Sequence, residues 1–103
     1  MATAEQLREA LKTIYDPELP INIVDLGLVY KVEAREEGKV YVEFSLTNPM
    51  CPIGDSLAAQ IRGALSAVEG VTGVEVKLVW DPPWSKERLT FEGKLQAGML
   101  GIG

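Results

Sequence analysis

The sequence predicts an α/β fold of the α+β type, a two-layer sandwich in which one three-stranded sheet carries both helices on the same face. Hydrophobic spacing gives the element order helix, strand, strand, helix, strand. Each predicted strand has one apolar face, so both helices have to cover that face. A chain of 103 residues is the size of one small domain, so residues 1–103 are assigned to a single domain.

The first helix is predicted over residues 4–14, where apolar side chains recur at helical spacing. Thr3 suits the N-cap, and Gln6 three positions later completes a capping box. The prolines of residues 16–20 end this helix. Residues 21–27 are predicted to form an ordered loop, in which Asp25 makes an Asx-turn toward the following glycine.

A β-hairpin is predicted next, with strands over residues 28–35 and 40–46 and a turn at residues 36–38. Gly38 is expected to supply a positive φ in that turn. Strict alternation along the first strand places Val29 on the open face of the sheet, away from the helices.

The second helix is predicted over residues 53–68, with Pro52 in its first turn. A third strand over residues 74–80 is stopped by the segment Asp81–Trp84. One helical turn is expected near residues 85–89. The glycine-rich tail, residues 90–103, is expected to be irregular.

Connectivity predicts that three loops meet at one edge of the sheet. If the hairpin reverses the chain and a helix returns it, the second and third strands are parallel. Residues 16–27, the turn around Cys51 and residues 81–84 then gather where the first strand begins. A thiol, several carboxylates and two tryptophans would share this edge, which makes it the candidate functional site.

Cys51 is the only cysteine, and the chain has no histidine. At a helix N-terminus its thiolate would be favoured and its pKa lowered, although neighbouring carboxylates oppose this. The alternative is a buried cysteine that acts as a small hydrophobic residue. A Cys–His nucleophile is excluded, and one cysteine cannot hold tetrahedral zinc or an iron–sulfur cluster within one chain. A metal shared between two chains, or transient transfer to a partner, stays open.

Composition excludes several classes of protein. The net charge of −5 argues against nucleic-acid binding, which usually needs a basic surface. No apolar run is long enough to cross a membrane, and the N-terminal residues lack the apolar core of a signal peptide. A cytoplasmic location is therefore expected, and the lone cysteine suits it.

The chain resembles the small domain shared by the SufT-type iron–sulfur maturation factors and the PaaD subunit of phenylacetate degradation. The resemblance rests on residues 16–20, residues 23–29, Thr47 with Cys51-Pro52, and residues 79–83. It implies a fold like the NifU C-terminal module and a role in cluster assembly or transfer. It also implies that Cys51 is the key residue, with Asp16, Glu18, Asp25 and Thr47 in support. The extra C-terminal cysteines of PaaD-type proteins are missing here.

The lone thiol beside carboxylates predicts a binding and transfer module, not an enzyme with turnover, and the resemblance implies that it is an accessory factor for iron–sulfur cluster maturation. Cys51 would hold iron or a cluster transiently, or share it between chains, and the partners would be the assembly machinery and client apo-proteins. The alternatives are a PaaD-like subunit of a phenylacetyl-CoA oxygenase and a protein–protein adaptor. A homodimer is also predicted, through an apolar patch of Val29, Tyr41 and Val79 on the open face of the sheet.

Overall fold

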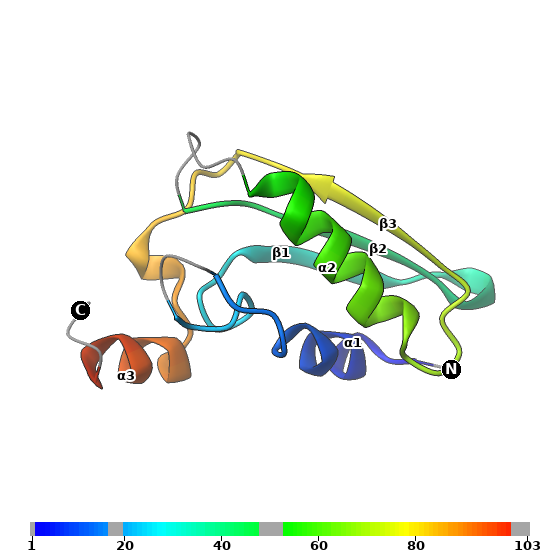
Figure 1. The fold of residues 1–103 in the computed structure, drawn as a ribbon, viewed down its shortest axis with the longest axis horizontal. Helices are drawn as coiled ribbons and strands as arrows, with labels where there is room; N and C mark the ends of the chain where they lie inside the picture. The colour runs from blue at the N-terminus through cyan, green and yellow to red at the C-terminus, as the bar shows by residue number, and fades with distance from the viewer. Residues whose placement is uncertain (1, 17–19, 48–52, 100–103) are drawn as a thin grey trace.

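The computed structural model describes residues 2–16, 20–47 and 53–99 of the chain (Figure 1). The elements follow in the order α1 (Ala4–Leu11), β1 (Val29–Ala34), β2 (Lys39–Phe44), α2 (Gly54–Ser66), β3 (Gly73–Leu78) and α3 (Phe91–Met99). Short 3-10 turns occupy Glu36–Gly38 and Lys86–Arg88. The α+β class is confirmed, with one helix more than the sequence predicted.

The N-terminal helix begins as the sequence predicts. Thr3 Oγ1 accepts a hydrogen bond from the backbone N–H of Gln6 at 3.1 Å, and the Thr3 N–H donates to Gln6 Oε1 at 2.9 Å. This capping box satisfies two N–H groups that have no partner inside the helix. The helix ends at Leu11, earlier than predicted, and the chain turns toward the loop that follows.

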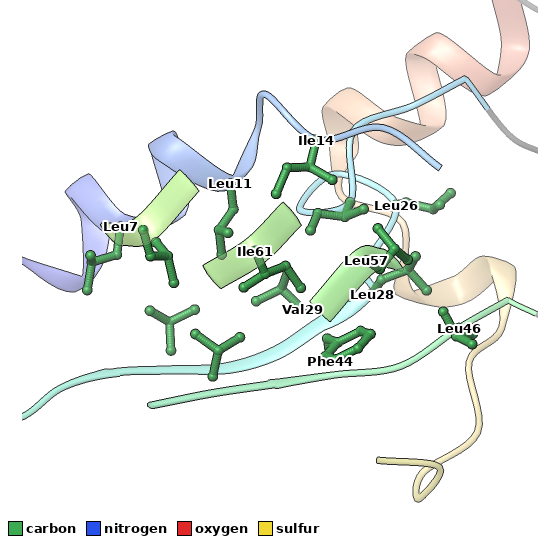
Figure 2. Packing of buried hydrophobic residues seen from close by; sticks show 14 of the residues in the cluster. Leu7, Leu11, Ile14, Leu26, Leu28, Val29, Phe44, Leu46, Leu57 and Ile61 are labelled. Atoms are coloured by element: carbon green, nitrogen blue, oxygen red, sulfur yellow. The ribbon is translucent and has the colours of Figure 1, made fainter. Parts of the chain in front are cut away.

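The sheet has the order β1-β2-β3, with β1 and β2 antiparallel and β2 and β3 parallel, as connectivity predicted. The 3-10 turn in the hairpin has positive φ at both Glu37 and Gly38. Helices α1 and α2 lie side by side on one face of the sheet (Figure 1). The core between the layers includes Leu7, Leu11, Leu57 and Ile61 from the two helices and Phe44 from β2 (Figure 2). These side chains and Val42 are inaccessible to solvent or nearly so.

One correction concerns the first strand, where a bulge breaks the predicted alternation. Val29 pairs with Phe44 and Lys31 pairs with Glu43, so Tyr30 is the extra residue. Because of this extra residue, Leu28, Val29 and Val32 all belong to the buried core. The prediction that Val29 lies on the open face was therefore wrong.

The open face of the sheet is more polar than predicted. Tyr41 is only 8% exposed because polar neighbours cover its ring. Its hydroxyl donates to Glu43 Oε2 at 2.6 Å, and the Arg35 guanidinium lies 4.4 Å from the ring centroid. Without Val29, the predicted apolar patch loses one of its three members.

The tail expected to be irregular contains α3, which is the second correction. This helix turns its small residues inward: Gly93 and Ala97 are buried. Its large apolar residues face solvent, with Phe91 67%, Leu95 51% and Met99 87% exposed. A glycine is required at position 93 because α3 lies so close to the loop that a Cβ would overlap the carbonyl oxygen of Asp25. Gly93, one of the glycines that suggested irregular structure, thus lets the helix pack.

Within the described ranges, none of the helices has the length and apolar character needed to cross a bilayer.

Candidate functional site

The loop before β1 and the segment after β3 come together, as predicted for two of the three loops. The Trp84 indole N–H donates to the carbonyl of Leu26 at 2.7 Å. The Tyr30 hydroxyl donates to the carbonyl of Pro82 at 2.8 Å, and the Arg88 guanidinium lies 4.1 Å from the Tyr30 ring centroid. The bulge that rotates Tyr30 out of the core therefore provides an anchor for residues 82–88.

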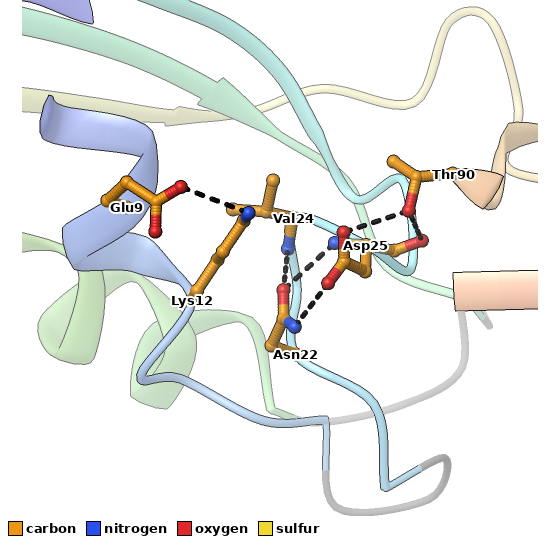
Figure 3. Close-up of polar contacts among 6 residues, drawn as sticks. All are labelled: Glu9, Lys12, Asn22, Val24, Asp25 and Thr90. Atoms are coloured by element: carbon orange, nitrogen blue, oxygen red, sulfur yellow. Dashed lines mark hydrogen bonds and ion pairs between the residues drawn. The ribbon is translucent and has the colours of Figure 1, made fainter. Parts of the chain in front are cut away.

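The loop itself is folded around the side chain of Asn22 (Figure 3). Its Oδ1 accepts hydrogen bonds from the N–H groups of Val24 at 3.1 Å and Asp25 at 2.9 Å. Its Nδ2 donates to Asp25 Oδ2 at 2.7 Å. The Asx-type turn predicted for Asp25 is therefore made by Asn22, three residues earlier. The N–H of Gly27, the predicted target of that turn, donates to the carbonyl of Val24.

Asp25 also holds the start of α3. Its Oδ1 accepts a hydrogen bond from the Thr90 hydroxyl at 2.8 Å, and its carbonyl accepts from the Thr90 N–H at 2.9 Å (Figure 3). The same hydroxyl accepts from the N–H of Gly93 at 3.0 Å, which caps the first turn of α3. We call these contacts of Asp25, Thr90 and Gly93 the latch. Both carboxylate oxygens of Asp25, which is 7% exposed, are engaged within the chain.

Lys12 supplies positive charge on the same side of the molecule. Its ammonium donates to Glu9 Oε1 at 3.1 Å (Figure 3). This hydrogen bond and the charge of Glu9 raise the pKa of Lys12, and the carboxylates of Asp25 and Glu92 add smaller effects in the same direction. The main electrostatic partner of Lys12 is therefore Glu9, within the same N-terminal segment.

Asp16 lies at the other end of the same loop and is only 3% exposed. Residues 14–16 run antiparallel to residues 21–23. The N–H of Ile23 donates to the Ile14 carbonyl at 2.9 Å, and the N–H of Asp16 donates to the Ile21 carbonyl at 3.4 Å. This pairing fixes the backbone on both sides of residues 17–20. Glu18, one of the predicted supporting residues, lies outside the described residues.

Cys51 also lies outside the described residues, so the predicted thiol position is bounded only by its neighbours. Thr47 follows β2 and is half-buried. On the other side α2 begins at Gly54, two residues after Pro52, so the proline precedes the helix. A Cβ at Gly54 would lie 3.2 Å from Leu78 and 3.7 Å from Leu46, so the helix start packs on the ends of β2 and β3. The flanks of the cysteine segment therefore lie at the predicted edge.

The start of α2 offers backbone donors. The first N–H groups of an α-helix have no intrahelical acceptor, and Ile53 at the N-cap provides no side-chain hydrogen bond to them. Such a helix end favours a thiolate or another anion. Asp55, in the first turn of α2, carries a negative charge that is stabilised by the same helix end and would oppose a second anion there. In the part of the chain that the structure describes, no group of three Asp, Glu, His or Cys side chains could hold a metal ion.

Sequence reasoning missed the residues that organise the loop. Thr90 acts across 65 positions of sequence, and nothing near it in the chain points to Asp25. Asn22 carried a local signal, because an Asn two or three residues before the bonded N–H groups is typical of an Asx-turn. Trp84 was placed at the correct edge, but its hydrogen bond to Leu26 depends on the tertiary fold.

Comparison with known proteins gives a consistent result. A family model described as "Iron-sulfur cluster assembly protein" matches residues 4–78. The "Fe-S protein maturation auxiliary factor" of Porphyromonas gingivalis is 39% identical over 100 residues, which cover 97% of this chain and 95% of that protein. The "Fe-S protein maturation auxiliary factor SufT" of Staphylococcus aureus is 40% identical, over 84% of this chain and 98% of that protein.

Among solved structures, a domain of unknown function from Bacillus anthracis superimposes with a TM-score of 0.87 at 38% identity, covering 97% of this chain and 92% of that one. The match thus extends beyond the sheet and its two covering helices to the C-terminal segment that forms the latch. The chain therefore belongs to the iron–sulfur cluster assembly protein family.

Proposed function

We propose that this protein is an accessory factor in iron–sulfur cluster maturation that carries iron or a cluster to client proteins through Cys51. The cargo is bound transiently, and no turnover chemistry is involved. Family membership and relatives named as maturation auxiliary factors support the pathway. The observation that carries the mechanism is a single thiol in a chain without histidine, three residues before the first residue of α2.

The predicted site residues differ in whether they could act as ligands of iron or a cluster. Asp25 already accepts hydrogen bonds from Asn22 and Thr90 on its two carboxylate oxygens, so its role is to hold the loop. The sequence assigns Asp16, Glu18 and Thr47 as supporting residues around Cys51, and Cys51 is the proposed ligand. Thiolate is the protein ligand that iron–sulfur clusters require, whereas carboxylates and a hydroxyl would tune or position it.

One thiol leaves most coordination positions of iron open, which suits a carrier. A cluster held by Cys51 would need ligands from a client, from a carrier partner or from a second copy of the chain. Binding would be weak until the receiving ligands arrive, and transfer would proceed by ligand exchange. The positive end of the α2 dipole would favour the anionic thiolate and its bound sulfide.

The test is anaerobic reconstitution with iron and sulfide, followed by transfer to an apo-protein client. Cys51→Ser should abolish both the visible absorption of a bound cluster and the acceleration of client maturation, while thermal unfolding stays near that of the native chain. Asp25→Asn is the matched control: it should lower stability but leave transfer largely intact below the unfolding temperature. Equal client maturation with and without the native protein in cells would refute the proposal.

The alternatives give different outcomes in the same experiments. If the protein is an adaptor with a structural Cys51, Cys51→Ala should reduce stability and leave client maturation unchanged. If it is a PaaD-like oxygenase subunit, it should copurify with oxygenase subunits and have no effect on unrelated iron–sulfur clients.

A further inference from the structure

Among the residues that the structure describes, strand β3 forms an edge of the sheet, and its outer backbone groups face away from β2. The N–H of Val79 donates to the carbonyl of Phe44 at 2.8 Å, in register with the pairing of Phe44 and Leu78. Backbone groups of a strand point alternately to either side. Those of Glu75 and Lys77 therefore point toward β2, and those of Val74, Val76 and Leu78 point outward. Such an edge is a template for a further strand.

The side chains of β3 are complementary to a second copy of the same strand. An antiparallel pair centred on Val76 would set Glu75 opposite Lys77 of the partner subunit, and Lys77 opposite Glu75 of the partner subunit. Both residues are exposed. In this register the outward backbone groups of Val74, Val76 and Leu78 all fall in hydrogen-bonded pairs. The backbone hydrogen bonds and the opposite charges are therefore both satisfied when the pair is centred on Val76.

The helix side of β3 is also incompletely covered. Val74, Val76 and Leu78 are only half-buried. A depression of about 430 Å³ lies between β3 and the part of α2 from Gly54 to Arg62, with Val76 and Leu78 in its wall. A partner strand would place further valines against this wall and bury apolar surface on both copies.

The rim of the depression carries one acidic and one basic residue, as β3 does with Glu75 and Lys77. Asp55, Ala58 and Arg62 share one face of α2 and line the depression. Asp55 lies at the Leu78 end, because the helix starts against Leu78. Arg62 lies about 10 Å further along the helix, toward the Val74 end. A two-fold axis at Val76 exchanges these ends, so Asp55 would approach Arg62 of the partner subunit.

We propose that two copies of this chain associate by antiparallel pairing of β3 about a two-fold axis at Val76, which joins their sheets into one of six strands. The pairing forms about six backbone hydrogen bonds and two pairs of opposite charges between the strands, and it sets two more pairs, Asp55 and Arg62, between the helices. The interface is self-complementary, as a two-fold axis requires. This surface replaces the open sheet face as the place where a homodimer forms.

The experiment is sedimentation velocity of the full chain over a range of concentrations, with thermal unfolding of each variant as a folding check. Glu75→Lys places two pairs of like charges across the axis, and we expect the dimer dissociation constant to rise about tenfold or more. Lys77→Glu should act in the same direction, although it also faces Glu43 within the chain. The double variant Glu75→Lys/Lys77→Glu restores opposite charges, and its dissociation constant should return to within about threefold of native.

Leu95→Asp is the control, because it alters the exposed apolar side of α3 and leaves β3 unchanged. It should leave the dimer intact. The proposal is overturned if the native chain is a monomer up to about millimolar concentration, since the two β3 strands would then not pair. It is also overturned if the double variant stays as weak as its single parents, or if Leu95→Asp alone removes the dimer.

Discussion

Replacing Gly93 with alanine tests whether the latch stabilises the protein. An alanine Cβ at this position would overlap the carbonyl oxygen of Asp25 and lie 2.9 Å from its carbonyl carbon. Both are backbone atoms of a buried loop, so they cannot move aside cheaply. The helix has to shift away from the loop instead, which separates Thr90 from Asp25.

The size of the effect follows from the bonds that the shift breaks. The hydrogen bond from the Thr90 hydroxyl to the Asp25 carboxylate, at 2.8 Å, is of the charged type that contributes about 1.5–3 kcal/mol. The Thr90 N–H bond to the Asp25 carbonyl, at 2.9 Å, adds about 1 kcal/mol. The better helix propensity of alanine offsets about 1 kcal/mol. Gly93→Ala should therefore cost about 1.5–3 kcal/mol, or roughly 7–14 °C in Tm.

Gly98→Ala in the same helix is the matched control, because a Cβ there meets nothing within 4 Å. It should stabilise the protein by up to about 1 kcal/mol through helix propensity alone. Urea unfolding of both variants measures the difference, and amide exchange at Thr90 reports whether the latch has opened. If Gly93→Ala proves as stable as Gly98→Ala, the close packing of α3 on the loop is wrong.

Two further predictions concern titration. The hydrogen bond from Tyr41 to Glu43, with burial and nearby carboxylates, raises the pKa of Tyr41 to about 12, so ultraviolet titration should show a step there that Tyr41→Phe removes. Because this pKa lies above the usual 10, the stabilisation from the Tyr41 hydroxyl is present below pH 10 and is lost as pH rises through 12. If Glu43→Gln leaves the titration step of Tyr41 unchanged, Glu43 is not the cause of the raised pKa. For Cys51, the alkylation rate should reach half its maximum at a pH below the ordinary thiol pKa of about 8.5. A midpoint at or above that value would argue against a thiolate favoured by the start of α2.

The layers and the strand directions were predictable because they depend on local period and connectivity. Apolar alternation identifies the hairpin, and a helix between two strands forces β3 to run parallel to β2. The bulge at Tyr30 was not predictable from period alone. The residue is drawn out of the core by contacts with Pro82 and Arg88, more than 50 positions away.

The candidate site shows the same division between local and distant causes. The sequence placed Asp25 and Trp84 at one edge, and the structure brings their segments together. It could not reveal that Thr90 binds Asp25, because the two residues meet only after the tail has folded back. The glycines of α3 were misleading for a related reason: Gly93 is needed by a neighbour in space and not by a neighbour in sequence.

The latch has a consequence for where this domain ends. The region shared across the family model stops at residue 78, before Trp84, Thr90 and α3. A polypeptide cut at that boundary would keep β1, β2 and β3 but lose the donors Trp84 and Thr90. The carbonyl groups of Asp25 and Leu26 and the buried carboxylate of Asp25 would then each lose a hydrogen bond. Unpaired polar groups of this kind are costly in a small domain with little stability to spare. The minimal autonomous folding unit is therefore expected to extend through α3, even though the recognisable family signature is shorter.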